Sequence, residues 1–218
     1  MNTGIEGRQP AAIMFTDMVG YRALTQRDEP LALDLLQEYH DILSDLLPAF
    51  QGHELKSTGD ALLLEFSSAL TAVRYAVELQ RALAERNEKK PEERQIQIRI
   101  GIHSGDVVRR EKDVLGDGAD VAARIAALAA PGGICVTRAV HDQIENQVPH
   151  RFVQLSTPEL KHSSASVEVY QIVEEAHPVD PRAAASSRKL LFWIVLGVTV
   201  LNMVLFLRFG CTRTTSLP

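Results

Sequence analysis

The sequence predicts an α+β fold in which long amphipathic helices pack on a mainly antiparallel sheet. Apolar runs of strand length alternate along the chain with longer stretches whose apolar residues recur every three or four positions. Several of the predicted strands follow one another through short turns, as antiparallel neighbours do. An uncharged stretch near the C-terminus predicts one further helix of a different kind.

The first half of the chain is predicted to hold three strands and two long helices. Residues 11–17 (AAIMFTD) are apolar up to a final aspartate and predict a buried strand, and an amphipathic helix follows through residues 30–50. Residues 53–66 (HELKSTGDALLLEF) predict two strands joined by a tight turn at Gly59–Asp60. Serine caps open a second helix over residues 67–87.

The second half continues the same pattern with shorter elements. In chain order these are a strand at 96–105, a hairpin through Asp106–Glu111, a glycine-broken turn leading into a helix at 113–124, a strand at 133–137, a short helix, and two late strands at 151–156 and 167–173.

The composition is that of a folded protein, and it excludes several classes. Hydrophobic residues make up 45% and charged residues 23% of the 218 residues. The net charge of −5, without a basic cluster, argues against a nucleic-acid partner. The two cysteines, Cys135 and Cys211, form neither a disulfide framework nor a zinc motif, which suits a reducing compartment.

The C-terminal region predicts a membrane anchor. Residues 190–207 (LLFWIVLGVTVLNMVLFL) carry no charge and have basic residues on both sides. At about 1.5 Å per residue, a helix of this length spans roughly 27 Å, close to the thickness of the bilayer core. The alternative is a buried helix, which would normally carry polar residues. We therefore expect a linker at 173–189, a transmembrane helix at 190–208 and a short tail at 209–218.

Two aspartates follow predicted strands next to glycine. Asp17 ends the first strand, and Asp60 lies in the turn between the next two. Carboxylates that converge from neighbouring strands could hold divalent ions for phosphoryl chemistry, whereas each taken singly suits a helix N-cap or a turn. Lys56, four residues before Asp60, suits either a solvated edge position or a donor to a base.

Six motifs in a fixed order resemble one family. They are FTDMVGY, LKSTGDALLLEF, IRIGIHSGDV, DVLGDGADVAARI, APGGICVT and ELKHSSASVEVYQI. Together, from Ala11 to Val173, they resemble the catalytic domain of class III nucleotidyl cyclases, the adenylyl and guanylyl cyclases. The resemblance implies a ferredoxin-like α/β sandwich with a mainly antiparallel sheet, occupying residues 1–172.

The resemblance also assigns site residues. Asp17 and Asp60 match the metal-binding aspartates, and the backbone of Met18, Val19 and Gly20 is implied to touch metal and phosphates, with Met18 as a further metal ligand. The implied cofactors are two Mg²⁺ or Mn²⁺ ions per site.

Other positions match the residues that read the nucleotide. Lys56 and Asp113 match the adenylyl pair that reads the adenine ring and its exocyclic amine; a carboxylate accepts from an amino group, whereas guanine presents an acceptor there. Arg124 matches the transition-state arginine, and Arg99 and Lys161 are candidates for binding the triphosphate.

The resemblance implies a reaction and a partner. ATP would be converted to 3′,5′-cyclic AMP and pyrophosphate by attack of its own 3′-hydroxyl. Each site would be shared by two chains of a head-to-tail homodimer. A nucleotide substrate implies that the domain faces the cytoplasm while the C-terminal helix holds it at the membrane.

One position departs from the family pattern. Asp120 stands where the family usually has asparagine, and it lies one helical turn before Arg124, a spacing that favours an ion pair. Asp120 could accept from the ribose hydroxyls in catalysis, or hold Arg124 away from the phosphate as a brake. In a third alternative the domain is a catalytically weak or silent, membrane-tethered module for nucleotide binding or dimerisation. A nucleotidyl-transferring domain with another product is a further candidate, which the Lys56–Asp113 pair disfavours.

Overall fold

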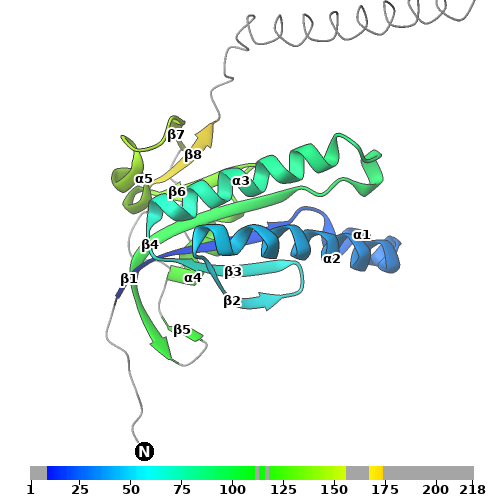
Figure 1. Ribbon diagram of the computed structural model, residues 1–218, viewed down its shortest axis with the longest axis horizontal. Coiled ribbons are helices and arrows are strands. Elements are labelled where there is room, and N and C mark those ends of the chain that lie inside the picture. Colours follow the sequence, from blue (N-terminus) through cyan, green and yellow to red (C-terminus); the bar gives the residue numbers. More distant parts are fainter. Residues whose placement is uncertain (1–8, 111–112, 116–117, 156–166, 174–218) are drawn as a thin grey trace, which may run out of the picture. The chain divides into compact units, whose positions relative to one another are not determined.

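The computed structural model describes residues 9–110, 113–115, 118–155 and 167–173 (Figure 1). The chain divides into two units, residues 1–175 and 176–218, and every described residue belongs to the first. The predicted anchor at 190–208 lies outside the described residues, as do Lys161 and nearly all of the predicted linker. Within the described ranges, no helix combines the length and apolar character needed to cross a bilayer.

The described strands form one mixed sheet of eight strands, in the order β2-β3-β1-β4-β6-β8-β7, with β5 paired to β4. Only β4 and β6 run parallel; the other neighbouring pairs are antiparallel, as predicted. The strands are β1 Gln9–Met18, β2 His53–Thr58, β3 Ala61–Phe66, β4 Ile98–Arg110, β5 Asp113–Leu115, β6 Ile134–Thr137, β7 Arg151–Leu155 and β8 Val169–Val173.

The predicted hairpin at Asp106–Glu111 is displaced along the chain. β4 continues unbroken to Arg110, because its residues up to Val107 pair with β1. β4 then pairs with β5, where Arg110 lies opposite Asp113. Asp113 therefore belongs to a short strand and not to the turn that the glycines suggested.

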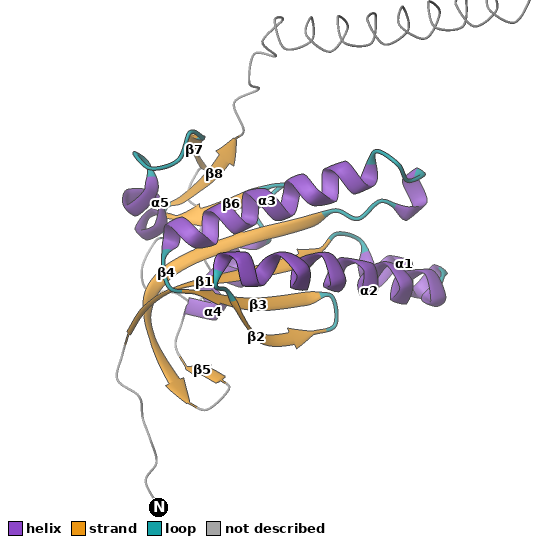
Figure 2. Ribbon diagram, in the orientation of Figure 1, coloured by secondary structure: helices purple, strands orange, loops and turns teal. Residues whose placement is uncertain are grey.

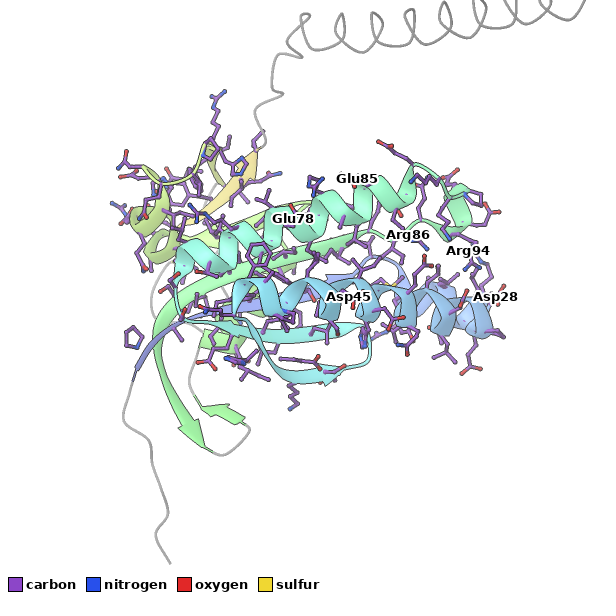
Figure 3. The ribbon with its side chains drawn as sticks, viewed as in Figure 1. Asp28, Asp45, Glu78, Glu85, Arg86 and Arg94 are labelled. Carbon is purple, nitrogen blue, oxygen red and sulfur yellow. The ribbon has the colours of Figure 1, made fainter. Side chains whose placement is uncertain are left out.

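The helices follow the predicted order, with one addition. They are α1 Tyr21–Arg27, α2 Glu29–Leu46, α3 Ala69–Asn87, α4 Gly118–Ala126 and α5 Arg138–Ile144, with 3₁₀ turns η1 Leu47–Phe50 and η2 Glu92–Arg94. α1 is separate from α2 because the Asp28 side chain caps α2, accepting a hydrogen bond from the Leu31 N–H (3.1 Å). Ser68 caps α3 in the same way, as predicted. Glu78 and Glu85 lie on the outer side of α3, where both pair with Arg81 (Figure 3).

The two faces of the sheet are covered differently. Figure 2 shows α2 and α3 on one face and α4 on the other. Met14 of β1 belongs to the large core beneath α2 and α3, while its neighbour Ile13 packs with Ala122 of α4. Since side chains alternate along a strand, Asp17 projects to the same side as Ile13. We call this side the α4 face.

The contact between α4 and β4 depends on the absence of a side chain at Gly101. A Cβ atom there would lie 2.2 Å from the Ala122 carbonyl oxygen and 2.4 Å from the Ala126 nitrogen. Both are backbone atoms of α4, so only a shift of the helix could relieve the clash. We expect Gly101→Ala to lower the free energy of unfolding by about 1–3 kcal/mol, measured by urea denaturation.

Gly118→Ala is the matched control for that experiment. A Cβ at Gly118 would meet only side-chain atoms, at 3.5 and 3.7 Å, which are ordinary contacts. Its urea midpoint should stay close to that of the unaltered protein. An unchanged midpoint in Gly101→Ala would contradict the close helix–strand packing.

Candidate active site

The two predicted metal-binding aspartates lie on neighbouring strands of the α4 face. In the β1–β3 ladder Asp17 lies opposite Ala61, and Asp60 immediately precedes Ala61 in the turn between β2 and β3. Gly59 takes a positive φ of 63° in that turn, a conformation that favours glycine. The tight turn therefore brings the Asp60 carboxylate beside the end of β1.

The pKa of Asp17 reflects its burial and the charges around it. Burial raises the pKa of Asp17 above its ordinary value of 3.8, and the negative charge of Asp60 raises it further. The positive charge of Arg99 opposes both effects. A cation bound between the aspartates would relieve their repulsion.

Replacing Asp17 should stabilise the metal-free protein. A raised carboxyl pKa means that ionising Asp17 lowers the free energy of unfolding. This destabilisation is absent below about pH 3.8, where the carboxyl is protonated in both states, and is fully present above the raised pKa. We expect Asp17→Asn to raise the melting temperature in EDTA at pH 7 by roughly 1–3 °C, and by less near pH 4. Thermal melts across this pH range test it. Asp45→Asn, an exposed change on α2, is the control, and an Asp17→Asn protein that melts below the unaltered one would contradict the expectation.

The loop after Asp17 exposes backbone next to the aspartates. Gly20 has φ 77° and precedes the first turn of α1. The Val19 N–H donates to the Gln97 carbonyl (2.8 Å), which ties the loop to the chain just before β4. A hollow of about 440 Å³ adjoins the loop and is lined by Val19, Gly20, Ala23, Leu24, Arg27, Glu92 and Glu93.

Lys56 lies on the α4 face as well, but away from the aspartates. It is an exposed residue of β2 opposite Leu63, which in turn lies opposite Phe15 of β1. Lys56 and Asp17 are therefore two strands apart, roughly 10 Å by the usual strand spacing. Phe15, Leu55 and Leu63 form a half-buried apolar patch between them.

α4 carries the other predicted residues. Arg124 is half-buried and Asp120 is exposed in the first turn. The ion pair that their spacing predicts stays a prediction. One-turn spacing brings two side chains to the same side of a helix, but it does not fix their rotamers. The side chain of Asp113, like all of Lys161, lies outside the described part.

One contact beneath the site was not predicted. The buried Thr16 hydroxyl forms a hydrogen bond of 2.5 Å with the Tyr39 hydroxyl of α2. Thr16 immediately precedes Asp17 in the sequence. Burial raises the pKa of Tyr39, so the phenol stays protonated. A tyrosine in the apolar stripe of a helix buries a hydroxyl that needs a hydrogen-bond partner. Its position in the sequence therefore indicates such a bond without identifying the partner.

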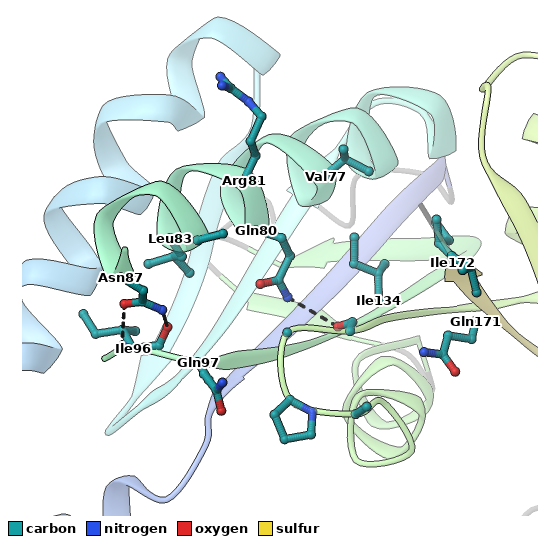
Figure 4. Close-up of a pocket in the computed structure, with 16 residues that line it drawn as sticks. Val77, Gln80, Arg81, Leu83, Asn87, Ile96, Gln97, Ile134, Gln171 and Ile172 are labelled. Atoms are coloured by element: carbon teal, nitrogen blue, oxygen red, sulfur yellow. Dashed lines mark hydrogen bonds between the residues drawn. The ribbon is translucent and has the colours of Figure 1, made fainter. Parts of the chain in front are cut away.

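A second hollow lies elsewhere and contains none of the predicted site residues. It has a volume of about 490 Å³ and lies between α3 and the ends of β6 and β8 (Figure 4). The Gln80 amide there donates to the Ile98 and Gly133 carbonyls (3.2 and 3.4 Å). These bonds fasten the loop after α4 to the start of β4.

The sheet order, the helix on the α4 face and the aspartate pair define a nucleotidyl cyclase type of domain. The family described as the adenylate and guanylate cyclase catalytic domain matches residues 5–174. The chain belongs to this family.

Individual relatives agree with the family. The chain is 39% identical over 164 residues to putative adenylate cyclase 3 of Rhizobium meliloti (strain 1021), covering 75% of this chain and 28% of that protein. It is 31% identical over 134 residues to an adenylate cyclase of Streptomyces coelicolor, covering 61% and 34%. The chain thus spans about a third or less of either relative.

Solved structures share the fold. A crystal structure described as an adenylate/guanylate cyclase/hydrolase from Silicibacter pomeroyi has a TM-score of 0.72 and 35% identity, covering 78% of this chain and 99% of that one. The adenylyl cyclase CyaB from P. aeruginosa has a TM-score of 0.68 at 21% identity, which shows a common fold.

Proposed function

We propose that this domain is an adenylyl cyclase that converts ATP to 3′,5′-cyclic AMP and pyrophosphate. The observation that carries the proposal is the Asp17–Asp60 pair at adjoining strand ends of the α4 face, the face on which Lys56 and α4 also lie. Family membership and relatives named as adenylate cyclases support it.

The aspartate pair suits Mg²⁺ or Mn²⁺, two per site. Two carboxylates close enough to repel each other offer the oxygen ligands that these ions prefer. Among the described residues no three His, Cys, Asp or Glu side chains gather around one point, so phosphate oxygens, water and the Met18 carbonyl would complete the coordination. When bound, the metals would lower the pKa of the 3′-hydroxyl and offset phosphate charge.

The protein's own groups would orient the nucleotide and offset its charge. The backbone at Met18, Val19 and Gly20 would contact the phosphates, and Arg99 and Lys161 would bind the triphosphate. Lys56 and Asp113 would select adenine. Arg124 would spread the charge that develops at the α-phosphate, a role that contributes several kcal/mol where such arginines are known.

Each site would be shared by two chains. The resemblance implies that the metal aspartates of one site come from one chain and its adenine readers and arginine from the other, and this chain carries both sets. The patch of Phe15, Leu55 and Leu63 supports a homodimer that meets on the α4 face.

Asp120 is proposed to accept hydrogen bonds from the ribose. Its exposed position in the first turn of α4 supports this role. Residues 190–208 are proposed to anchor the protein in a membrane with the domain on the cytoplasmic side. The membrane anchor is proposed because residues 190–207 carry no charged side chain and have basic residues on both sides.

Nucleotide preference tests the proposal. We expect purified protein with Mn²⁺ to cyclise ATP at least about tenfold faster than GTP. Guanylyl cyclases of this family typically have glutamate and cysteine at the two positions that read the base. The Lys56→Glu, Asp113→Cys double variant should therefore shift the GTP-to-ATP rate ratio by roughly 10- to 100-fold toward GTP. Lys89→Glu, a charge change on the loop after α3, is the control. Equal rates with both nucleotides in the unaltered protein would refute the adenine assignment.

A further inference from the structure

A half-buried histidine lies between the sheet and the start of α4. In the β1–β4 ladder His103 is directly opposite Ile13, so its side chain projects to the α4 face. Gly118, the first residue of α4, lies over both side chains. A Cβ atom at Gly118 would be 3.5 Å from His103 Cδ2 and 3.7 Å from Ile13 Cγ1. The imidazole ring therefore packs against the N-terminal end of α4.

A hydrogen bond to the end of β6 holds this ring. His103 Nδ1 and the hydroxyl oxygen of the buried Thr137 are 3.2 Å apart. Thr137 is the N-cap residue of α5, a position where a threonine hydroxyl usually accepts a hydrogen bond from the first turn of the helix. Within the described part of the chain, the Thr137 side chain makes no capping bond to α5. Its hydroxyl is used to bond His103 instead.

The surroundings of His103 leave its ring little freedom. A Cβ atom at Gly105 would be 2.9 Å from His103 Nε2, closer than side-chain atoms normally approach. Burial lowers the pKa of the imidazole below its usual 6.5, so the ring is uncharged at pH 7. A ring that has backbone close by on two sides and a bonded Nδ1 is suited to hold the neighbouring helix in place.

The first turn of α4 carries a residue of the proposed site. Asp120 lies two residues after Gly118, whereas Arg124 lies one turn further along. The middle of α4 is fixed separately, by its close contact with Gly101. Loosening the contact at His103 would therefore displace Asp120 more than Arg124.

We propose that His103 is a positioning residue of this site. Through its hydrogen bond to Thr137 it holds the first turn of α4, and with it Asp120, against the sheet. The inference rests on the proposed function for the role of Asp120 toward the ribose, whereas the contact between His103 and α4 does not depend on that function.

Hydrogen exchange in the full-length protein tests the contact without turnover. Thr137→Val removes the hydroxyl with little change of shape, and Thr137→Ser keeps it. We expect the amides of residues 118–126 to exchange about fivefold faster in Thr137→Val and close to normally in Thr137→Ser. The exchange of α5 should not change in either variant, because the Thr137 side chain does not cap that helix. Thr71→Val, the same substitution in α3 on the opposite face, is the control.

The kinetics of ATP cyclisation test the consequence for Asp120. A misplaced ribose loses the alignment of its 3′-hydroxyl, which lowers kcat more than it raises KM. We expect Thr137→Val to lower kcat with Mn²⁺ about five- to tenfold, and Thr137→Ser to keep most of the activity. His103→Phe, which retains a ring without the nitrogen, should behave like Thr137→Val. Adding Thr137→Val to Asp120→Ala should lower kcat little further, because both changes remove the same interaction.

The inference is overturned if residues 118–126 exchange normally in Thr137→Val, or if α3, α4 and α5 all exchange faster to the same extent. Additive losses of kcat in the Thr137→Val, Asp120→Ala double variant would also overturn it. A protein that forms no cyclic nucleotide refutes the proposed function, and the exchange of α4 still decides whether His103 holds it. An active cyclase with normal exchange in Thr137→Val refutes this inference alone.

Discussion

Replacing Asp60 with alanine is expected to abolish cyclisation, lowering kcat by at least about 10³-fold. Asp60 is one of the two aspartates proposed to hold the metals, so its loss leaves Asp17 as the single proposed carboxylate ligand for two metals. Cyclic AMP formation from ATP with Mn²⁺, beside the exposed Asp45→Ala change as a control, measures the effect.

Thermal stability separates a chemical loss from unfolding. The charge of Asp60 raises the pKa of Asp17, so its removal relieves repulsion in the metal-free fold. The melting temperature of Asp60→Ala in EDTA should therefore be unchanged or higher. A variant that keeps more than about a tenth of the original rate would contradict the metal assignment.

Mixing two inactive chains is expected to restore activity. Asp17→Ala lacks a metal ligand and Arg124→Ala lacks the transition-state arginine, so each homodimer is inactive at both sites. In a mixed dimer one site receives both damaged halves and the other receives both intact halves. With random exchange half of the dimers are mixed, which predicts about a quarter of the unaltered activity.

The mixture needs a control for each chain alone at the same total concentration. Asp17→Ala mixed with Asp60→Ala is the matched negative control, because both changes damage the same half of the site. Recovery in that mixture, or none in the first, would argue against sites shared between chains.

The sequence predicts most of the fold because its strongest signals are local. The apolar run that ends in Asp17 and the Gly59–Asp60 turn are set by neighbouring residues, and both appear as predicted. The Asp28 cap that separates α1 from α2 is also local, but the continuous amphipathic pattern after it masked the break.

The features that could not be predicted depend on distant partners. The Thr16–Tyr39 hydrogen bond joins residues 23 positions apart. The Arg99 Nε is buried without a hydrogen-bond partner among the described residues, and this depends on the surrounding fold and on no sequence spacing.

The most direct measurement is the product formed by the purified full-length protein from ATP with Mn²⁺, with Asp60→Ala as the blank. An adenylyl cyclase releases cyclic AMP and pyrophosphate in equal amounts, forms far less cyclic GMP from GTP, and loses both products in the blank. ATP binding without pyrophosphate release, or cyclic GMP formed as readily as cyclic AMP, would contradict the proposed function.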